Sequence, residues 1–166
     1  ESMDFGYSLG VLHHVTDTQE SLNNCVSKLK KGAPFLLYLY YKFDNRSTIF
    51  KFIWHVSNIL RFFICRLPFS IKKLVTDFIA VIIYWPMSRF ALLVNKLGLK
   101  DSSIPLSFYK NSSFYTMRTD SLDRFGTKLE KRYTKNSMEK LMLDCGLVNI
   151  KFSNNEPYWV AVGYRK

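Results

Sequence analysis

The first part of the chain shows three successive patterns of apolar and polar residues: an alternation, a helical spacing and an unbroken apolar run. Alternation of apolar with smaller residues over 5–11 predicts a short strand that runs into a loop. Leu22, Val26 and Leu29 then recur at helical spacing, and the unbroken apolar run 35–41 is typical of a strand covered on both faces. A strand, a helix and a strand in this order form a crossover, so we expect the two strands to be parallel.

Polar residues around the predicted helix indicate where it begins and ends. Asp17 or Thr18 can accept hydrogen bonds from the free N–H groups of the first turn, and Glu20, three residues after Asp17, fits a capping box. Gly32 can adopt the left-handed conformation that commonly ends a helix. We therefore expect residues 1–45 to form one βαβ crossover.

Residues 46–100 differ from what precedes them in being apolar, aromatic and basic. Polar residues recur every three or four positions over 47–65, which predicts an amphipathic helix with a wide apolar face. A proline ends this pattern, and a second helix is expected over 71–97 with a kink at Pro86. The apolar run 78–87 has ten residues, fewer than the ~20 needed to span a bilayer. The segment is therefore interpreted as a helical insertion or lid.

Residues 101–166 begin with a polar stretch and end with regular elements. The stretch 101–119 is rich in Ser, Asn and Tyr and is interpreted as a loop. Thr134 can cap the helix that follows it. Strands are predicted over 147–152 and 158–164, and they should pair antiparallel because few residues separate them.

The formal net charge of +11 is concentrated in one part of the chain. Residues 46–100 hold nine Lys and Arg against Asp77 alone, a net charge of +8. Such a field favours an acidic partner: a phospholipid surface, a nucleic acid or an anionic substrate. The bases are spaced along helix faces rather than clustered, so nucleic acid is disfavoured and a peripheral membrane contact through 46–100 stays open.

Composition sets the remaining bounds. The chain has 166 residues, of which 48% are apolar, so a packed core is expected. Cys25, Cys65 and Cys145 lie far apart, without the spacing of a disulfide framework or a zinc site, which fits a reducing cytosol. No basic-then-apolar leader is visible at the first residues. We expect a cytoplasmic protein, with membrane association left open.

Two motifs stand out: Val11-Leu-His-His14 followed by Asp17, and Leu29-Lys-Lys-Gly-Ala33. They are similar to the "VLHH", Asp and "LKPGG" pattern around the fourth and fifth strands of the class I S-adenosylmethionine-dependent methyltransferases. Lys31 stands in place of the proline and Ala33 in place of the second glycine. Residues 134–166, with Cys145-Gly-Leu147 at their centre, resemble the closing helix and terminal antiparallel strand pair of that family.

The resemblance implies an α/β fold: a Rossmann-like methyltransferase sheet that lacks its N-terminal half and carries an inserted helical subdomain. Its implied parts are the second half of the methyltransferase core (1–45), the helical insertion or lid (46–100), and a loop with the closing helix and strand pair (101–166). The implied activity is transfer of a methyl group from S-adenosylmethionine to a small-molecule or lipid-like acceptor.

The resemblance also implies a site. Ligands of doubly wound sheets bind at the carboxyl ends of the strands. By resemblance, the residues there that bind S-adenosylmethionine are Ser8, Leu9, Gly10 and His13. His14 and Tyr40 are the corresponding candidates for contact with the methyl acceptor, and His14 is also the candidate catalytic base. No metal site is expected, because no third ligand accompanies the two histidines.

One departure from the family is large. The Gly-rich loop after the family's first strand and the acidic residue that binds the ribose have no counterpart, and no GxGxG occurs in the chain. We therefore expect this chain to be a fragment of a methyltransferase, inactive by itself.

Other interpretations stay open. The main alternative is a non-enzymatic peripheral membrane protein that attaches through the basic aromatic segment 46–100, and an RNA methyltransferase is a third. Asp17 is interpreted first as a helix cap. The Tyr-rich stretch 109–115, with Arg118 and Asp120 nearby, fits a substrate pocket and a solvated loop equally.

Overall fold

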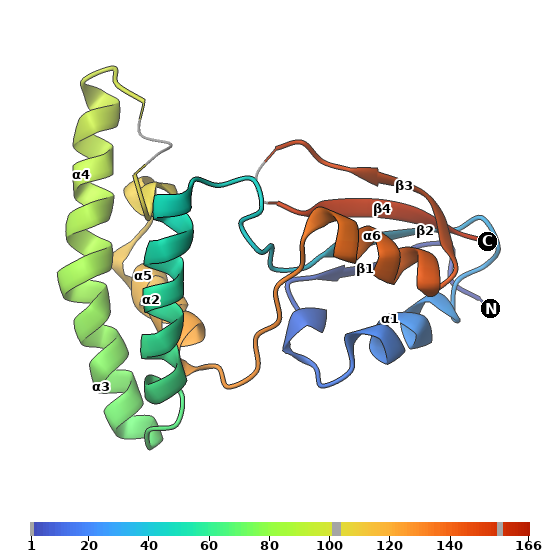
Figure 1. The fold of residues 1–166 in the computed structure, drawn as a ribbon, viewed down its shortest axis with the longest axis horizontal. Helices are drawn as coiled ribbons and strands as arrows, with labels where there is room; N and C mark the ends of the chain where they lie inside the picture. The colour runs from blue at the N-terminus through green and yellow to red at the C-terminus, as the bar shows by residue number, and fades with distance from the viewer. Residues whose placement is uncertain (1, 101–103, 156–157) are drawn as a thin grey trace. The chain divides into compact units, whose positions relative to one another are not determined.

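The computed structural model describes residues 2–100, 104–155 and 158–166. The chain forms two compact units, coloured along the sequence in Figure 1. The sheet unit comprises Glu1–Arg46 and Leu129–Lys166, and the helical unit comprises Ser47–Lys128. The helical unit is thus an insertion between two parts of the sheet unit, and it extends further along the chain than residues 46–100.

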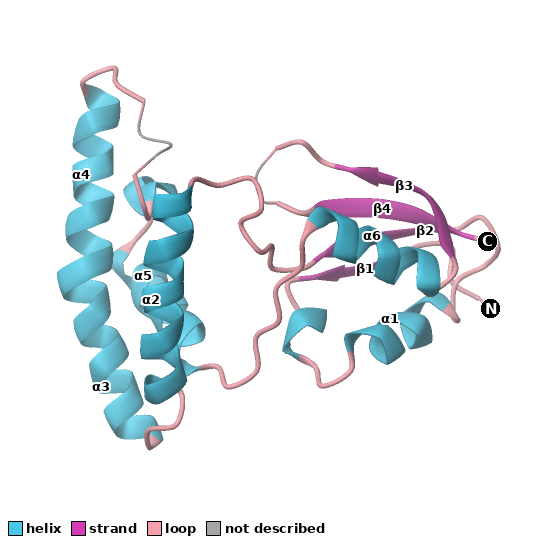
Figure 2. Cartoon of the chain, viewed as in Figure 1, coloured by secondary structure: helices cyan, strands magenta, loops and turns pink. Residues whose placement is uncertain are grey.

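The sheet unit is an α/β structure with one mixed four-stranded sheet (Figure 2). Its strands are β1 (Gly6–Leu9), β2 (Pro34–Tyr38), β3 (Leu147–Phe152) and β4 (Val160–Arg165), in the spatial order β1-β2-β4-β3. β1 and β2 are parallel, and β4 is antiparallel to both β2 and β3. The predicted parallel crossover and the predicted antiparallel pair are both confirmed. The position of β4 between β2 and β3 was not predicted.

The helices of this unit cover one face of the sheet. They are the 3-10 turn η1 (Leu12–His14), α1 (Thr18–Val26) and α6 (Lys135–Asp144). Leu22 of α1, Leu37 of β2 and Met142 of α6 are fully buried together in one core. Leu36 and Tyr38, which alternate with Leu37 along β2, are only half-buried. The prediction of a strand covered on both faces is therefore wrong for the described residues, because helices pack on one face alone.

The predicted helix caps are present. Asp17 caps α1, its carboxylate accepting a hydrogen bond from the Glu20 N–H at 2.9 Å. Thr134 caps α6 by accepting from the Ser137 N–H at 3.1 Å. Gly32 has the left-handed φ of +76° but does not end α1, which already stops at Val26. It shapes the turn before β2 instead.

The helical unit holds the two predicted helices and one that was missed. Its elements are α2 (Thr48–Ile64), α3 (Phe69–Ile79), the π-turn η2 (Ala80–Tyr84), α4 (Trp85–Lys96), the 3-10 turn η3 (Ser107–Asn111) and α5 (Phe114–Gly126). The interpretation of 101–119 as a loop is wrong where α5 begins; residues 101–103 lie outside the described residues. Ser113 caps α5 by accepting from the Thr116 N–H at 3.1 Å, a start signal hidden among many similar polar residues.

Pro86 lies inside a continuous helical stretch from α3 to α4. A proline in a helix lacks the N–H and crowds the carbonyl four residues earlier. The π-turn η2, immediately before it, widens the helix at that point. Among the described residues, Phe69–Lys96 is also the one helical stretch long and apolar enough to cross a membrane, although core helices of water-soluble proteins meet the same criteria.

Candidate functional site

The first three candidate residues follow one another at the carboxyl end of β1. Ser8 is buried, Leu9 is half exposed, and Gly10 has a left-handed φ of +69°. The Gly10 N–H donates to the Tyr38 carbonyl at 3.0 Å, which ties the ends of β1 and β2 together. Because this N–H is already engaged, Gly10 can offer a ligand only its carbonyl and the space of a missing side chain.

The next three candidates form one aromatic cluster. His13, in η1, is fully buried. Its ring stacks on Tyr40, just beyond β2, with centroids 3.7 Å apart and planes inclined by 27°. The His14 ring lies 4.1 Å from His13. The structure therefore brings His13, His14 and Tyr40 together at the edge where both parallel strands end.

Residues 131–133, where the chain re-enters the sheet unit, hold this cluster in place by backbone hydrogen bonds. The Lys131 N–H donates to the His13 carbonyl, and the Tyr133 N–H donates to the Tyr40 carbonyl, both at 2.9 Å. Below η1, the buried Thr18 hydroxyl donates to the Leu12 carbonyl at 3.0 Å. The His13 and Tyr40 carbonyls are thus satisfied by residues more than ninety positions away in the sequence, and the Leu12 carbonyl by a residue six positions away.

The His13 imidazole is electrically neutral in this setting. Its pKa is lowered from 6.5 to about 4, mainly by burial and in smaller part by the charge of the neighbouring His14. Neither Nδ1 nor Nε2 has a hydrogen-bond partner among the described residues. A buried polar group without a partner costs about 1–3 kcal/mol, so these nitrogens mark a place suited to a ligand.

His14 is oriented by a single hydrogen bond. Its Nδ1 lies 2.8 Å from the Leu129 carbonyl oxygen. A carbonyl only accepts, so Nδ1 carries the proton and donates it. In the neutral ring Nε2 is then the acceptor, the state a general base requires.

Sequence reasoning missed two charged residues of this site. Glu130 and Arg132 form an ion pair at 2.8 Å, and both side chains are nearly buried. The Arg132 guanidinium also lies 5.2 Å from the centroid of the Tyr40 ring and donates to the Tyr41 carbonyl at 3.2 Å. The only signal in the sequence is the charged run Glu130-Lys-Arg132, which is indistinguishable from a solvated loop.

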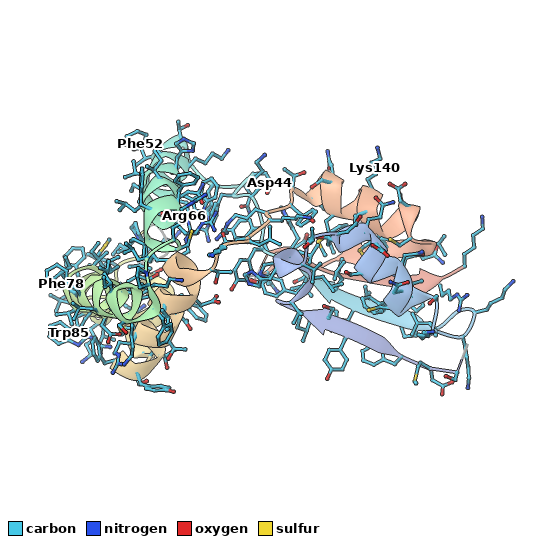
Figure 3. The ribbon with its side chains drawn as sticks, turned by 90° about the horizontal axis from the view of Figure 1, so that it is seen from below. Asp44, Phe52, Arg66, Phe78, Trp85 and Lys140 are labelled. Carbon is cyan, nitrogen blue, oxygen red and sulfur yellow. The ribbon has the colours of Figure 1, made fainter. Side chains whose placement is uncertain are left out.

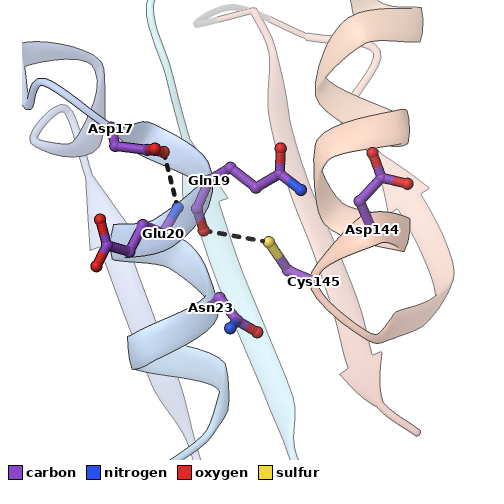
Figure 4. Close-up of a pocket in the computed structure, with 6 residues that line it drawn as sticks. All are labelled: Asp17, Gln19, Glu20, Asn23, Asp144 and Cys145. Atoms are coloured by element: carbon purple, nitrogen blue, oxygen red, sulfur yellow. Dashed lines mark hydrogen bonds between the residues drawn. The ribbon is translucent and has the colours of Figure 1, made fainter.

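A separate pocket lies between helices α1 and α6 of the sheet unit (Figure 4). Its volume is about 360 Å³, and its lining comes from the first turns of α1 and the end of α6: Asp17, Gln19, Glu20, Asn23, Asp144 and Cys145. Two of these groups are committed to local structure, since Asp17 caps α1 and the Cys145 thiol donates to the Gln19 carbonyl at 3.5 Å. None of the candidate residues from the sequence lines it.

Metal and disulfide chemistry find little support in the described residues. No group of three or more His, Cys, Asp or Glu side chains gathers closely enough there to hold a metal ion. Cys25, Cys65 and Cys145 are all free thiols. Burial raises the pKa of the Cys145 thiol, which disfavours the reactive thiolate.

The Tyr-rich stretch 109–115, for which a substrate pocket and a solvated loop were both left open, belongs to the helical unit. Its Tyr109 lies in η3 with its ring centroid 5.4 Å from that of Tyr84 in the small core of that unit. Arg118 pairs with Asp77 at 2.9 Å, joining α5 to α3. These contacts give both residues structural roles within the helical unit.

Comparison of the chain with protein-family models, with curated proteins and with solved structures found no match.

Proposed function

We propose that the sheet unit is the carboxyl-terminal part of a class I S-adenosylmethionine-dependent methyltransferase sheet. The observation that carries the proposal is the parallel β1-α1-β2 crossover, which gathers Gly10, His13, His14 and Tyr40 at the carboxyl ends of its strands. This edge is where open α/β sheets bind ligands. The antiparallel β3–β4 pair at the end of the chain adds a second feature of the resemblance.

The residues present fit one half of the cofactor. Gly10 leaves space at the strand end, and the unpartnered His13 nitrogens are suited to polar groups such as those of the methionine part. The adenosine part has no such fit, because the chain contains no GxGxG loop. The activity is therefore proposed for a longer protein that supplies this loop, and this chain alone is expected to be inactive.

S-adenosylmethionine, when bound, supplies a methyl group on a positively charged sulfur. The chain's own residues would hold the acceptor beside it. Nδ1 of His14 is hydrogen-bonded to the Leu129 carbonyl. Nε2 would therefore be the atom that accepts the proton lost by an O–H or N–H methyl acceptor. Tyr40, packed against His13 and near Arg132, would form an aromatic wall that positions the acceptor.

The test uses the protein together with the residues encoded upstream in its source. Binding of S-adenosylhomocysteine is measured by calorimetry, and transfer of tritiated methyl from S-adenosylmethionine is measured with lipid and small-molecule extracts. His13→Ala should weaken cofactor binding, whereas His14→Ala should depress transfer more than binding. His55→Ala, an exposed histidine of α2, is the matched control. Absence of any cofactor binding by the longer protein would overturn the proposal.

The second candidate function, a non-enzymatic membrane-binding protein, is favoured by the apolar outer faces of the helical unit. A longer protein that binds vesicles but no cofactor would support it over methyl transfer. Unchanged transfer by His14→Ala would remove only His14 from the site and leave the methyltransferase proposal standing.

A further inference from the structure

Helix α2 exposes an unusually large apolar surface for a helix packed in water. Large apolar side chains follow each other at helical spacing along its outer face and are strongly exposed: Ile49 is 73% accessible, Phe52 is 68% and Phe63 is 64%. Figure 3 labels Phe52 at the outside of the helical unit. The face of α2 that packs on the rest of the unit is mixed: Ile64 is buried in the core there, and polar side chains lie beside it.

The inner face of α2 also carries polar groups. Arg61 donates to the Thr127 carbonyl at 2.8 Å and to the Asn58 side chain at 3.0 Å. Arg124 of α5 donates to the Ser57 hydroxyl at 3.1 Å. The contact of α2 with the unit therefore combines the buried Ile64 with these hydrogen bonds, and much of the apolar surface of α2 is left outside.

The long stretch from α3 to α4 has the same arrangement. Small or hydroxylated residues are fully buried against α5 and η3: Thr76, Ala80, Ser88 and Ala91. The Ser121 hydroxyl of α5 donates to the Thr76 carbonyl at 2.9 Å in this interior.

Large residues of the same stretch face outward. Leu74 is 71% accessible, Phe78 is 62% and Leu97 is 67%. Phe78 and Trp85 are labelled at the outside of the unit in Figure 3.

This pattern points to a solvent less polar than water. Among the described residues of the helical unit, the core cluster has five buried large residues: Ile64, Ile79, Tyr84, Met117 and Phe125. Contiguous exposed apolar surface of this extent marks an interaction site in soluble proteins. Small residues and hydroxyl hydrogen bonds between helices, with large apolar residues outside, are the packing that helices use in lipid.

Charge distinguishes between two partners that could cover this apolar surface: a second copy of the chain and an anionic lipid surface. Residues 47–128 hold 12 Lys and Arg against four Asp and Glu, so they carry +8 of the net +11. Lys51, Lys73 and Lys96 are exposed on the same helices as the apolar stripes. A second copy would bring the same positive charge and repel it. An anionic lipid surface offers both the acyl layer and the opposite charge.

We propose that the helical unit lies in the interface of an anionic lipid bilayer. The outer faces of α2 and of α3–α4 enter the acyl boundary, and the lysines reach the headgroup phosphates with their chains along the apolar surface. This inference is independent of methyl transfer, since it rests on the helical unit alone.

The attachment is interfacial and does not span the bilayer. The stretch between Asp77 and Arg89 contains 11 uncharged residues, 78–88, which is ~16 Å of helix. The hydrocarbon core of a bilayer is ~30 Å thick. Asp77 is paired with Arg118 inside the unit, and Arg89 donates to the Ser112 carbonyl at 3.0 Å, so both ends of the stretch are fixed in protein.

The first test is co-sedimentation of the full chain with vesicles of phosphatidylcholine containing phosphatidylglycerol, and with vesicles of phosphatidylcholine alone. The chain should bind the anionic vesicles, and binding should fall as salt is raised. Replacing Phe52, Phe78 and Trp85 together by Ser should weaken binding by at least roughly tenfold. Replacing Lys51, Lys73 and Lys96 by Gln should weaken it by roughly fivefold for each charge at low salt.

Matched controls change the same chemistry in the sheet unit. Phe5, Tyr7 and Leu143, all exposed there, are replaced by Ser. Lys140, Lys151 and Lys166 are replaced by Gln; Lys140 is labelled in Figure 3. Both control triples should bind vesicles as the unchanged chain does. Equal loss in control and test variants would overturn the proposal, as would absence of binding to anionic vesicles at low salt.

The second test reports on the apolar face directly. Lipids brominated in the acyl chain should quench the fluorescence of the bound chain, and Trp85→Phe should remove most of that quenching. Light scattering in solution tests the rival occupant. A stable dimer that the apolar triple variant dissociates, without quenching by brominated lipid, would assign the surface to a second copy and reject the bilayer.

Discussion

The ring of His13 stacks on the ring of Tyr40 with their centroids 3.7 Å apart, although 27 positions of chain separate them. His13 follows β1 and Tyr40 follows β2, so the contact exists only because these strands are parallel neighbours. The tyrosine covers one side of the imidazole. Burial, to which this contact contributes, is the largest cause of the lowered pKa of His13.

The first prediction concerns stability against pH. The folded-state pKa of His13 is about 4, against 6.5 for an ordinary histidine. Below 6.5 the unfolded chain takes up a proton that the folded chain takes up only near 4. The free energy of unfolding of the sheet unit should therefore be highest above pH 6.5 and fall as the pH drops toward 4, by about 3 kcal/mol in total.

Urea titrations at pH 7 and pH 5 measure this effect. Fluorescence of Trp159, whose indole N–H donates to Asp44 at 3.0 Å, reports on the sheet unit once Trp54 and Trp85 are replaced by Phe. His13→Leu in that background should remove the loss, because the titrating group is gone, and should cost little at pH 7. His55→Gln should keep the loss. An unchanged pH dependence in His13→Leu would assign it to other groups.

The second prediction concerns the ion pair between Glu130 and Arg132. Arg132→Met removes the cation of the ion pair with the Glu130 carboxylate, whose side chain is 2% accessible. Removing one member of a buried pair costs about 3–5 kcal/mol. The same urea titration should show a much smaller loss when Glu130→Gln is added to Arg132→Met. A loss that is simply additive would mean that the two charges do not act as a pair.

Sequence reasoning succeeded where signals are local. The caps at Asp17 and Thr134, the helix starting after Ser47 and the antiparallel end of the chain all depend on residues within a few positions of one another. It also placed the strands of the crossover, because an apolar run and a helical stripe have distinct periods.

Sequence reasoning failed where the structure depends on contacts between residues far apart in the sequence. Nothing near His13 in the sequence indicates that Lys131 and Tyr133 return to fasten the cluster, or that Glu130 and Arg132 complete it. The same holds for the polarity of α2. The amphipathic pattern was recognised, but only the contact of Arg61 with Thr127 reveals that polar residues of α2 also pack inward, beside Ile64.

The third prediction concerns the turn after β1. Gly10 has φ +69°, and a Cβ added there would meet nothing closer than the Tyr38 ring at 3.9 Å. The free-energy cost of adding a side chain at position 10 therefore comes from backbone strain and not from a steric clash. Gly10→Ala should lower the free energy of unfolding by about 1 kcal/mol, Gly10→Asn by less and Gly10→Val by more. Equal losses in the three variants would argue against a left-handed turn.

The fourth prediction separates the two roles open to Asp17. Its carboxylate accepts from the Glu20 N–H at 2.9 Å, so Asp17→Ala should lower the free energy of unfolding by about 1 kcal/mol. Asp17→Asn keeps an acceptor oxygen and should lose no more than a few tenths of a kcal/mol. Thr134→Ala, which removes the cap of α6, is the matched control and should resemble Asp17→Ala. If Asp17→Asn were as unstable as Asp17→Ala, the negative charge rather than the hydrogen-bonded cap would be what the fold requires, and the interpretation of Asp17 as a helix cap would be wrong.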